Sequence, residues 1–343
     1  MKMSKRTLIK AMSATLIMGT AAGTVGLAQA ADAKRSYVLA TASTGGTFYP
    51  VGVALATLTK VKLEPTIGMS ISAINSAGSG ENIKLMREDE AQLSILQGLY
   101  GAWAWEGEGR MANEGPQKNL RSITMLWQNV EQFVVKSDYV KSGTITDMNN
   151  LASEKFSIGT KNSGTEGSGL TLLNNMDIAV DDLDMAYMGY AASADALQNG
   201  TIDGMNIPSG VPTSAITRAY AALGNDITVL DFSDEQIAQA NGNYQLWTRF
   251  EIPANTYPGQ TKAINTIAQP NFLAVRDDMS EEDVYQLTKT IYENLPFLNG
   301  IHKATKAMSI EKAIAGLPVP LHPGAARYYR EAGLTIPAHL ITE

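Results

Sequence analysis

The chain has 343 residues, a formal net charge of −7 at pH 7 and no cysteine. The lack of cysteine excludes disulfides, thiol chemistry and lipid attachment through a cysteine. The excess of acidic residues argues against nucleic acid and anionic membrane surfaces as partners. This length is sufficient for two α/β domains.

The first 30 residues have the pattern of a cleaved secretory signal. The stretch opens with four cations, Lys2, Lys5, Arg6 and Lys10. A run of apolar or small residues over 11–27 follows, and Ala28-Gln29-Ala30 matches an A-x-A cleavage site before Ala31. A membrane anchor is the weaker alternative, because glycines dilute the apolar run. We therefore expect a periplasmic protein without a membrane anchor, with a charge of about −11 once the four cations are removed from −7.

After this leader, short apolar strands alternate with helices. In the first part we expect strands over residues 37–41, 67–74, 91–97 and 120–127, and helices over 50–60 and 79–86. From residue 133 the pattern restarts, with strands over 155–159 and 202–207 and helices over 147–151, 170–175 and 192–198. A strand over 272–275 then returns to the first part, and helices follow over 281–294 and 309–315. This alternation is typical of parallel sheets built from βαβ units, and it predicts an α/β fold.

Three loops rich in glycine, serine and threonine stand where a strand is followed by a helix. They cover residues 41–47, 75–80 and 159–169. Backbone N–H groups at the start of a helix are unpaired and lie at the positive end of its dipole, where an anion can bind. In an α/β sheet such loops gather beyond the carboxyl ends of the strands. The first two loops lie about eighty residues or more before the third. This separation indicates that the loops approach a bound anion from two sides.

Several motifs along the chain resemble those of one family. They lie at residues 43–52, 78–82, 95–97, 158–165, 194–203, 210–212, 252–260 and 316–330. Together they resemble the TAXI proteins, the extracytoplasmic solute receptors of one branch of the tripartite ATP-independent periplasmic (TRAP) transporters. The resemblance spans nearly the whole chain after the leader.

This resemblance implies a type II periplasmic binding protein fold, with two α/β lobes joined by a hinge and a ligand cleft between them. Residues 31–130 and 267–343 would form lobe 1, and residues 131–266 lobe 2. The family implies a small carboxylate ligand such as glutamate or 2-oxoglutarate, delivered to a TRAP-type membrane permease. We expect a monomer without a cofactor or a metal. Two local departures from the family pattern, at residues 127–131 and at Lys161-Asn162, leave the identity of the ligand open.

The candidate ligand-binding residues follow from the loops and the strand ends. In lobe 1 they are Thr44, Gly45, Gly46, Thr47, Tyr49, Ser79 and Gln97. In lobe 2 they are Lys161, Ser163, Gly164, Thr165, Tyr190, Ser209 and Gly210. The threonines offer hydroxyl or backbone donors, and the tyrosines offer a ring face or a phenol.

Some of these residues have a simpler interpretation. Gly45 and Gly46 would serve equally as turn formers if they were read alone. Lys161 could pair with a second carboxylate or lie in solvent, and Gln97 could bind the ligand or close a turn. Glu131 would repel a carboxylate but suit an amino group, and a surface position is an equal alternative.

The sequence gives little support to an enzyme. All three histidines, His302, His322 and His339, lie in the C-terminal segment away from the loops. Neither a G-x-S-x-G nor an H-E-x-x-H motif occurs. A secreted hydrolase that uses the loops as an oxyanion cradle is therefore a remote alternative. A receptor that presents its ligand to a membrane sensor is an alternative closer to the expected function.

Overall fold

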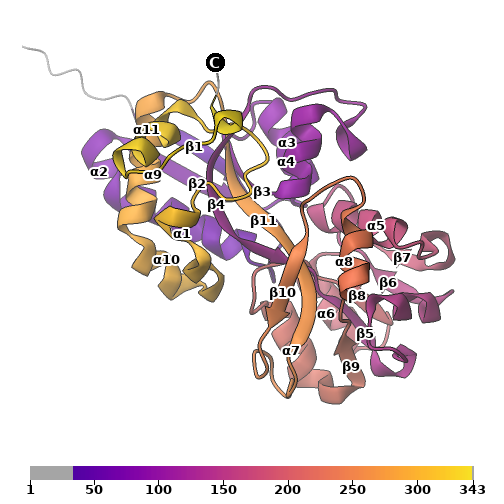
Figure 1. Cartoon of the computed structure of the whole chain (residues 1–343). Coiled ribbons are helices and arrows are strands. Elements are labelled where there is room, and N and C mark those ends of the chain that lie inside the picture. The colour runs from indigo at the N-terminus through magenta and orange to yellow at the C-terminus, as the bar shows by residue number, and fades with distance from the viewer. Residues whose placement is uncertain (1–33, 342–343) are drawn as a thin grey trace, which may run out of the picture. The chain divides into compact units, whose positions relative to one another are not determined.

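The computed structural model describes residues 34–341 (Figure 1). The predicted signal sequence lies outside the described residues. Within them, the α/β fold is built on two sheets, each covered by helices, and the predicted two-lobe α/β class is confirmed. None of the described helices combines the length and the apolar character that crossing a membrane would require.

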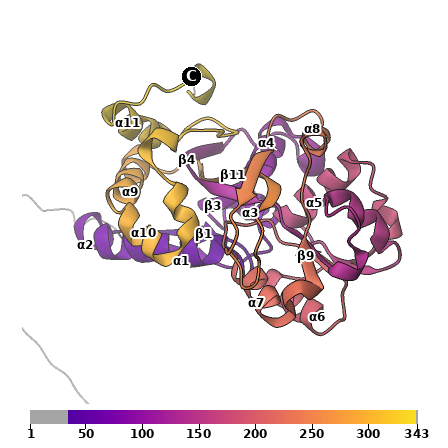
Figure 2. The same ribbon diagram turned by 60° about the horizontal axis from the view of Figure 1, so that its bottom comes forward.

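The first lobe contains a six-stranded sheet in the order β10-β11-β3-β1-β2, with β4 paired to β11. Its strands are β1 (Arg35–Ala40), β2 (Met69–Ile74), β3 (Leu93–Gln97), β4 (Leu120–Val130), β10 (Thr248–Ile252) and β11 (Ile264–Arg276). Its helices are α1 (Phe48–Lys62), α2 (Glu64–Ile67), α3 (Ser79–Arg87), α4 (Gly98–Glu106), α9 (Glu281–Glu293), α10 (Leu295–Ile301) and α11 (Pro323–Glu331). Helices α1, α9, α10 and α11 gather on one side of the sheet, and α3 and α4 lie on the other (Figures 1 and 2). With both faces covered, every residue of β3 is buried.

The second lobe contains a five-stranded sheet in the order β7-β6-β8-β5-β9. Its strands are β5 (Phe133–Lys136), β6 (Lys155–Ser157), β7 (Asp184–Ala186), β8 (Gly204–Asn206) and β9 (Ile227–Val229). Its helices are α5 (Gly164–Asn175), α6 (Tyr190–Gln198), α7 (Ser214–Leu223) and α8 (Asp234–Asn241). Helix α5 packs with α8, and α6 packs with α7.

Both sheets are mixed, so the prediction of parallel sheets is only partly right. Strands β1, β2 and β3 are parallel, as are β6, β7 and β8. However, β11 runs antiparallel to β3, β4 and β10, and β5 runs antiparallel to β8 and β9. Strands β4 and β5 follow one another in the chain but lie in different sheets, and β10 and β11 are joined without a helix between them, so βαβ units do not set the directions of these strands.

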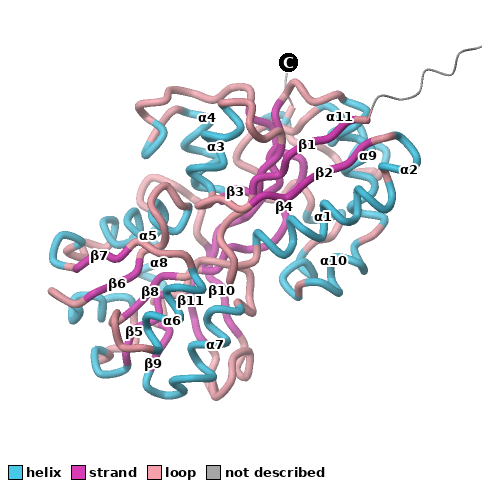
Figure 3. Tube along the Cα trace, turned by 180° about the vertical axis from the view of Figure 1, so that it is seen from behind, coloured by secondary structure: helices cyan, strands magenta, loops and turns pink. Residues whose placement is uncertain are grey.

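Two adjacent segments connect the lobes. Strand β4 ends at Val130 and β5 begins at Phe133, so only Glu131 and Gln132 separate the two sheets there. The long strand β11 pairs with β4 and runs from the first sheet toward the second (Figures 1 and 3). Strand β10, which the sequence analysis placed with lobe 2, pairs with β11 in the first sheet.

One helix was not predicted and another begins earlier than predicted, both in glycine-rich segments. Residues 98–106 form α4, and α5 begins at Gly164 rather than near residue 170. A Cβ atom on Gly101 would lie 2.7 Å from the Phe272 ring, and one on Gly167 would collide with the Tyr100 phenol. These glycines therefore allow close packing of a helix on its neighbours, which outweighs their low helix propensity.

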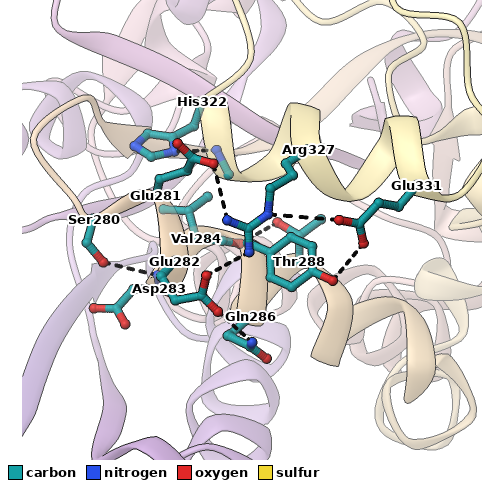
Figure 4. A network of polar contacts seen from close by, with 12 residues as sticks. Ser280, Glu281, Glu282, Asp283, Val284, Gln286, Thr288, His322, Arg327 and Glu331 are labelled. Carbon is teal, nitrogen blue, oxygen red and sulfur yellow. Dashed lines mark hydrogen bonds and ion pairs between the residues drawn. The ribbon is translucent and has the colours of Figure 1, made fainter. Parts of the chain in front are cut away.

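The C-terminal motif joins two helices of the first lobe. Arg327 on α11 donates hydrogen bonds to Glu281 (3.2 Å) and Glu282 (2.7 Å) on α9 (Figure 4). Its guanidinium also lies 3.8 Å from the centre of the Tyr285 ring. The buried His322 ring accepts from the Gly324 N–H at the start of α11. These contacts give the motif a structural role.

Candidate ligand-binding site

A central pocket forms where four helices begin. Its lining residues come from the first turns of α1, α3, α5 and α6 and from the segments before them, with additions from β3 and the segment after β8. They are Ala42, Ser43, Gly46, Thr47, Phe48, Ala77, Gly78, Ser79, Gln97, Thr160, Ser163, Gly164, Thr165, Gly189, Tyr190, Pro208 and Ser209. Helices α1 and α3 belong to the first lobe, and α5 and α6 to the second. The pocket is therefore shared by the two lobes.

The helix starts supply the donors of this pocket. The first N–H groups of any helix have no acceptor within it. Those of Ser79 on α3 and of Gly164 and Thr165 on α5 also find no acceptor elsewhere among the described residues. Four helix dipoles thus direct their positive ends at one small volume, which favours an anion.

The pocket holds donors but no formal charge. Among the described residues, those that line it are hydroxyl, amide, small or apolar, and none is acidic or basic. Glu81 and Glu166 lie in the first turns of α3 and α5, but their carboxylates accept from the backbone N–H groups of Ala77 (2.5 Å) and Asn162 (2.7 Å). Any anion bound in the pocket would therefore be held by neutral hydrogen-bond donors and dipoles.

Gln97 is the amide in this set. It ends β3, and its Oε1 atom is buried without a partner among the described residues. A Cβ atom on Gly164 would lie 2.7 Å from that oxygen, so the amide faces the start of α5. A buried amide oxygen without a protein partner carries a free-energy cost that a hydrogen-bond donor of a ligand could remove.

Contacts between the lobes surround the pocket. Thr47 Oγ1 donates to the Gly210 carbonyl (3.1 Å), and the Tyr100 hydroxyl donates to the Ser163 carbonyl (3.0 Å). The Glu81 N–H donates to the Asn162 carbonyl at 3.0 Å. The space between the lining residues is about 440 Å³ including its opening. In this closed arrangement the pocket suits a small ligand.

Nine of the fourteen candidate residues line the pocket. They are Gly46, Thr47, Ser79, Gln97, Ser163, Gly164, Thr165, Tyr190 and Ser209. The hydroxyl of Tyr190 donates to the Pro208 carbonyl and lies 2.7 Å from Thr165 Oγ1, so both side chains are fixed in place. Burial raises the pKa of the Tyr190 phenol, which keeps it protonated as a donor.

The other five candidates lie outside the pocket. Thr44 is exposed, and Tyr49 is half-buried on α1. Gly45 and Gly210 serve packing instead, because Cβ atoms there would lie 3.0 Å from the Ala191 nitrogen and 2.6 Å from the Ala304 side chain. Lys161 is exposed, with its ammonium 5.0 Å from the centre of the Tyr187 ring.

Sequence reasoning missed eight lining residues. These are Ala42, Ser43, Phe48, Ala77, Gly78, Thr160, Gly189 and Pro208. Most are immediate neighbours of residues that were selected, so the loops themselves were the available signal. The Phe48 ring also contacts Trp127 of β4, with ring centres 6.1 Å apart. That contact joins the pocket to the segment between the lobes.

Glu131 lies neither on the surface nor in the pocket, which corrects the earlier expectation. Its side chain is fully buried in the link between β4 and β5. Its Oε2 atom accepts from Asn206 Nδ2 at 3.3 Å, whereas Oε1 has no partner among the described residues. Burial raises the pKa of this carboxyl to about 7, against the opposing effect of nearby donors such as Asn206 and Ser168.

An outer cleft lies next to the central pocket. Its lining residues are Gly80, Glu81, Lys84, Arg87, Tyr100, Arg110, Met111, Glu114, Lys161 and Asn162. Four of these carry a positive charge and two a negative charge, whereas the whole chain carries −7. The contact between Glu81 and Asn162 separates the cleft from the pocket, and the ion pair of Arg110 with Glu166 (3.4 Å) lies beside it.

Two of the histidines form hydrogen bonds that support the fold. His302 and His322 both accept from backbone N–H groups, and burial lowers the pKa of each. Over residues 34–341, acidic residues and histidines do not gather in groups of three that could hold a metal ion.

The fold and the shared pocket define the class of protein. The chain has the fold of periplasmic binding proteins, in which it resembles MatC from Rhodopseudomonas palustris solved with bound malate. The two share 14% identity over 86% of this chain and 98% of that chain, with a TM-score of 0.55. PhnD1 from Prochlorococcus marinus in complex with methylphosphonate shares 11% identity over 88% and 99%, with a TM-score of 0.52. Residues 39–333 match the NMT1-like family, and the chain belongs to that family.

Proposed function

We propose that this protein is a periplasmic solute receptor that binds a small organic anion in the central pocket. The observation that carries the proposal is the convergence of four helix N-termini from two lobes on a small pocket lined by neutral donors. Each such contact contributes roughly 0.3–2 kcal/mol. Several together approach the roughly 8 kcal/mol of a micromolar site.

The pocket favours an organic acid over an acidic amino acid. A carboxylate could accept from the N–H groups of Ser79, Gly164 and Thr165. The ammonium of glutamate would find no carboxylate among the described lining residues. We therefore place ligands such as 2-oxoglutarate ahead of glutamate. The malate held by MatC and the methylphosphonate held by PhnD1 support an oxyanion as the ligand class.

We further propose that the bound acid is delivered to a TRAP-type membrane permease. The support is the resemblance of the motifs to TAXI receptors, together with the signal-like first 30 residues. Closure around the ligand would select the state that the permease recognises. Delivery to an ABC-type permease or to a membrane sensor are the alternatives, and growth of a receptor deletion strain on the identified acid would separate uptake from sensing.

The ligand class can be tested by thermal shift followed by calorimetry. The panel contains 2-oxoglutarate, malate, glutamate, methanesulfonate, methylphosphonate and an uncharged sugar, each measured near pH 6. A ligand at 100 times its Kd stabilises by about 2.7 kcal/mol. Stabilisation by the sugar alone would contradict an anion site.

Two threonines on the same helix provide matched variants. Thr165→Val removes a hydroxyl that lines the pocket, and Thr171→Val removes one that bonds the Gly167 carbonyl on the same helix. We expect Thr165→Val to raise Kd by roughly 3- to 10-fold, the loss of one net hydrogen bond. The control variant should leave Kd unchanged. Equal Kd values for both variants would exclude Thr165 from the site.

A further inference from the structure

Glu131 occupies the short link between the two lobes. Its backbone N–H donates to the Ile267 carbonyl (2.9 Å), and its carbonyl accepts from Thr266 Oγ1 (2.6 Å). Both partners belong to β11, the other segment that joins the lobes. The residue is thus fixed where the two connecting segments meet.

The carboxyl group is surrounded by neutral polar groups. Four elements contribute them: Ser168 on α5, Asn206 on β8, Trp247 before β10 and Gln269 on β11. Ser168 Oγ, Trp247 Nε1 and Gln269 Nε2 are buried and, like Glu131 Oε1, lack a partner among the described residues. The titratable group that faces Glu131 is the Tyr190 phenol of α6. Glu131 forms no ion pair among the described residues, so no cation offsets its charge when it ionises.

The link that carries this carboxyl group follows a residue that is bonded to the wall of the pocket. Val130 and Ser209 exchange backbone hydrogen bonds of 2.9 and 3.0 Å, and Ser209 lines the pocket. The charge of Glu131 also reaches the phenol of Tyr190, which lines the pocket from α6. Two negative charges separated by buried protein repel more strongly than they would in water.

We propose that anion binding in the central pocket is coupled to the uptake of one proton by Glu131. The inference rests on the proposed function, because it requires an anionic ligand. The proton comes from solvent and is held on the Glu131 carboxyl group, so that the net charge added by a monoanion is zero.

The coupling has a defined direction. Burial raises the pKa of Glu131 to about 7, and an anion bound nearby would raise that pKa further. Below this range the carboxyl group is already neutral and binding costs no proton. Between this pKa and the higher pKa of the bound state, binding draws in a proton, so Kd should rise by up to about tenfold per pH unit.

The test is calorimetry with anions whose charge is constant in the pH range used. We choose 2-oxoglutarate and methanesulfonate, titrated at about pH 6 and pH 8 in two buffers with different ionisation enthalpies. The dependence of the heat on the buffer gives the number of protons taken up. We expect a measurable fraction of one proton at pH 8, which is larger the more the bound anion raises the pKa, and close to none at pH 6.

Two variants distinguish proton uptake by Glu131 from proton uptake by other groups. Glu131→Gln keeps the shape but cannot titrate, so its Kd should be independent of pH and its proton uptake zero. Glu251→Gln, an exposed change on β10, should behave as wild type. Binding by wild type without proton uptake at pH 8 would overturn the coupling and leave the receptor function standing. The wild-type result decides this even if Glu131→Gln fails to fold. Failure of every anion to bind both proteins at both pH values would overturn the receptor function, and the coupling with it.

Discussion

The buried carboxyl group should also make the stability of the ligand-free protein depend on pH. Burial raises the pKa of Glu131 from 4.5 to about 7. An acid whose pKa is raised by folding binds its proton more tightly in the folded state. Its protonated form therefore supports the fold at low pH, and that contribution is lost as pH rises from about 4.5 to about 7.

The magnitude follows from the size of the shift. One pKa unit corresponds to about 1.36 kcal/mol, so a shift of about 2.5 units corresponds to roughly 3 kcal/mol at pH 8. Glu131→Gln removes this cost, because the amide never ionises. Relative to wild type, the variant should gain up to about 3 kcal/mol between pH 5 and pH 8. With the usual unfolding entropy per residue, this is roughly 5 °C in Tm for a protein of this size.

Thermal unfolding without ligand measures this effect. The quantity to compare is the Tm difference between Glu131→Gln and wild type, at pH 5 and at pH 8. Taking the difference removes the titration of all other groups, including the half-buried His302 and the buried His322. Glu251→Gln should show no change between the two pH values. An equal Tm difference for Glu131→Gln at both pH values would refute the reasoning, because it would mean that Glu131 titrates alike in the folded and unfolded chain.

Two further predictions concern packing and charge. Gly101→Ala should destabilise by roughly 1–3 kcal/mol in chemical denaturation, since its Cβ would lie 2.7 Å from the Phe272 ring. Gly300→Ala, on α10 with open space around it, should be neutral or stabilising, and an equal loss would argue against the packing explanation. Lys84→Gln, in the outer cleft, should slow the association of 2-oxoglutarate about twofold at low salt and not at high salt, measured by stopped-flow tryptophan fluorescence. The control Lys289→Gln removes a similar helical ion pair of another helix, α9 (3.9 Å in both cases). If this variant slowed association equally, local steering by the outer cleft would be excluded.

The sequence predicted most of the first lobe because its signals are local. Strand β1 (Arg35–Ala40), strand β2 (Met69–Ile74) and helix α3 (Ser79–Arg87) end within a few residues of the predicted limits. Apolar runs bounded by glycine, serine and threonine specify such elements over short distances. The same local signals failed at α4 (Gly98–Glu106) and at the start of α5. There, glycine is required by a neighbouring side chain that is distant in sequence.

The site shows the same division. The loops that precede α1, α3 and α5 could be selected from the sequence, because hydroxyl and glycine residues at helix starts are local features. The sequence did not show which residues of each loop face the pocket. Thr44 and Thr47 are three residues apart in one loop, yet Thr44 is exposed and Thr47 lines the pocket. Only the position of the second lobe distinguishes them.

The sequence by itself thus determined the alternation of strands and helices and the donor-rich starts of three helices. These depend on hydrophobic spacing and on the chemistry of individual turns. The tertiary structure decided that four helix starts meet in one pocket and that Glu131 is buried in the link between the two sheets. Glu131 lies in a two-residue link between strands of different sheets, where no periodic pattern indicates which side is covered. Its burial results from the packing of α5, β8 and β11 around the link, and burial without a cation is what raises its pKa into the neutral range.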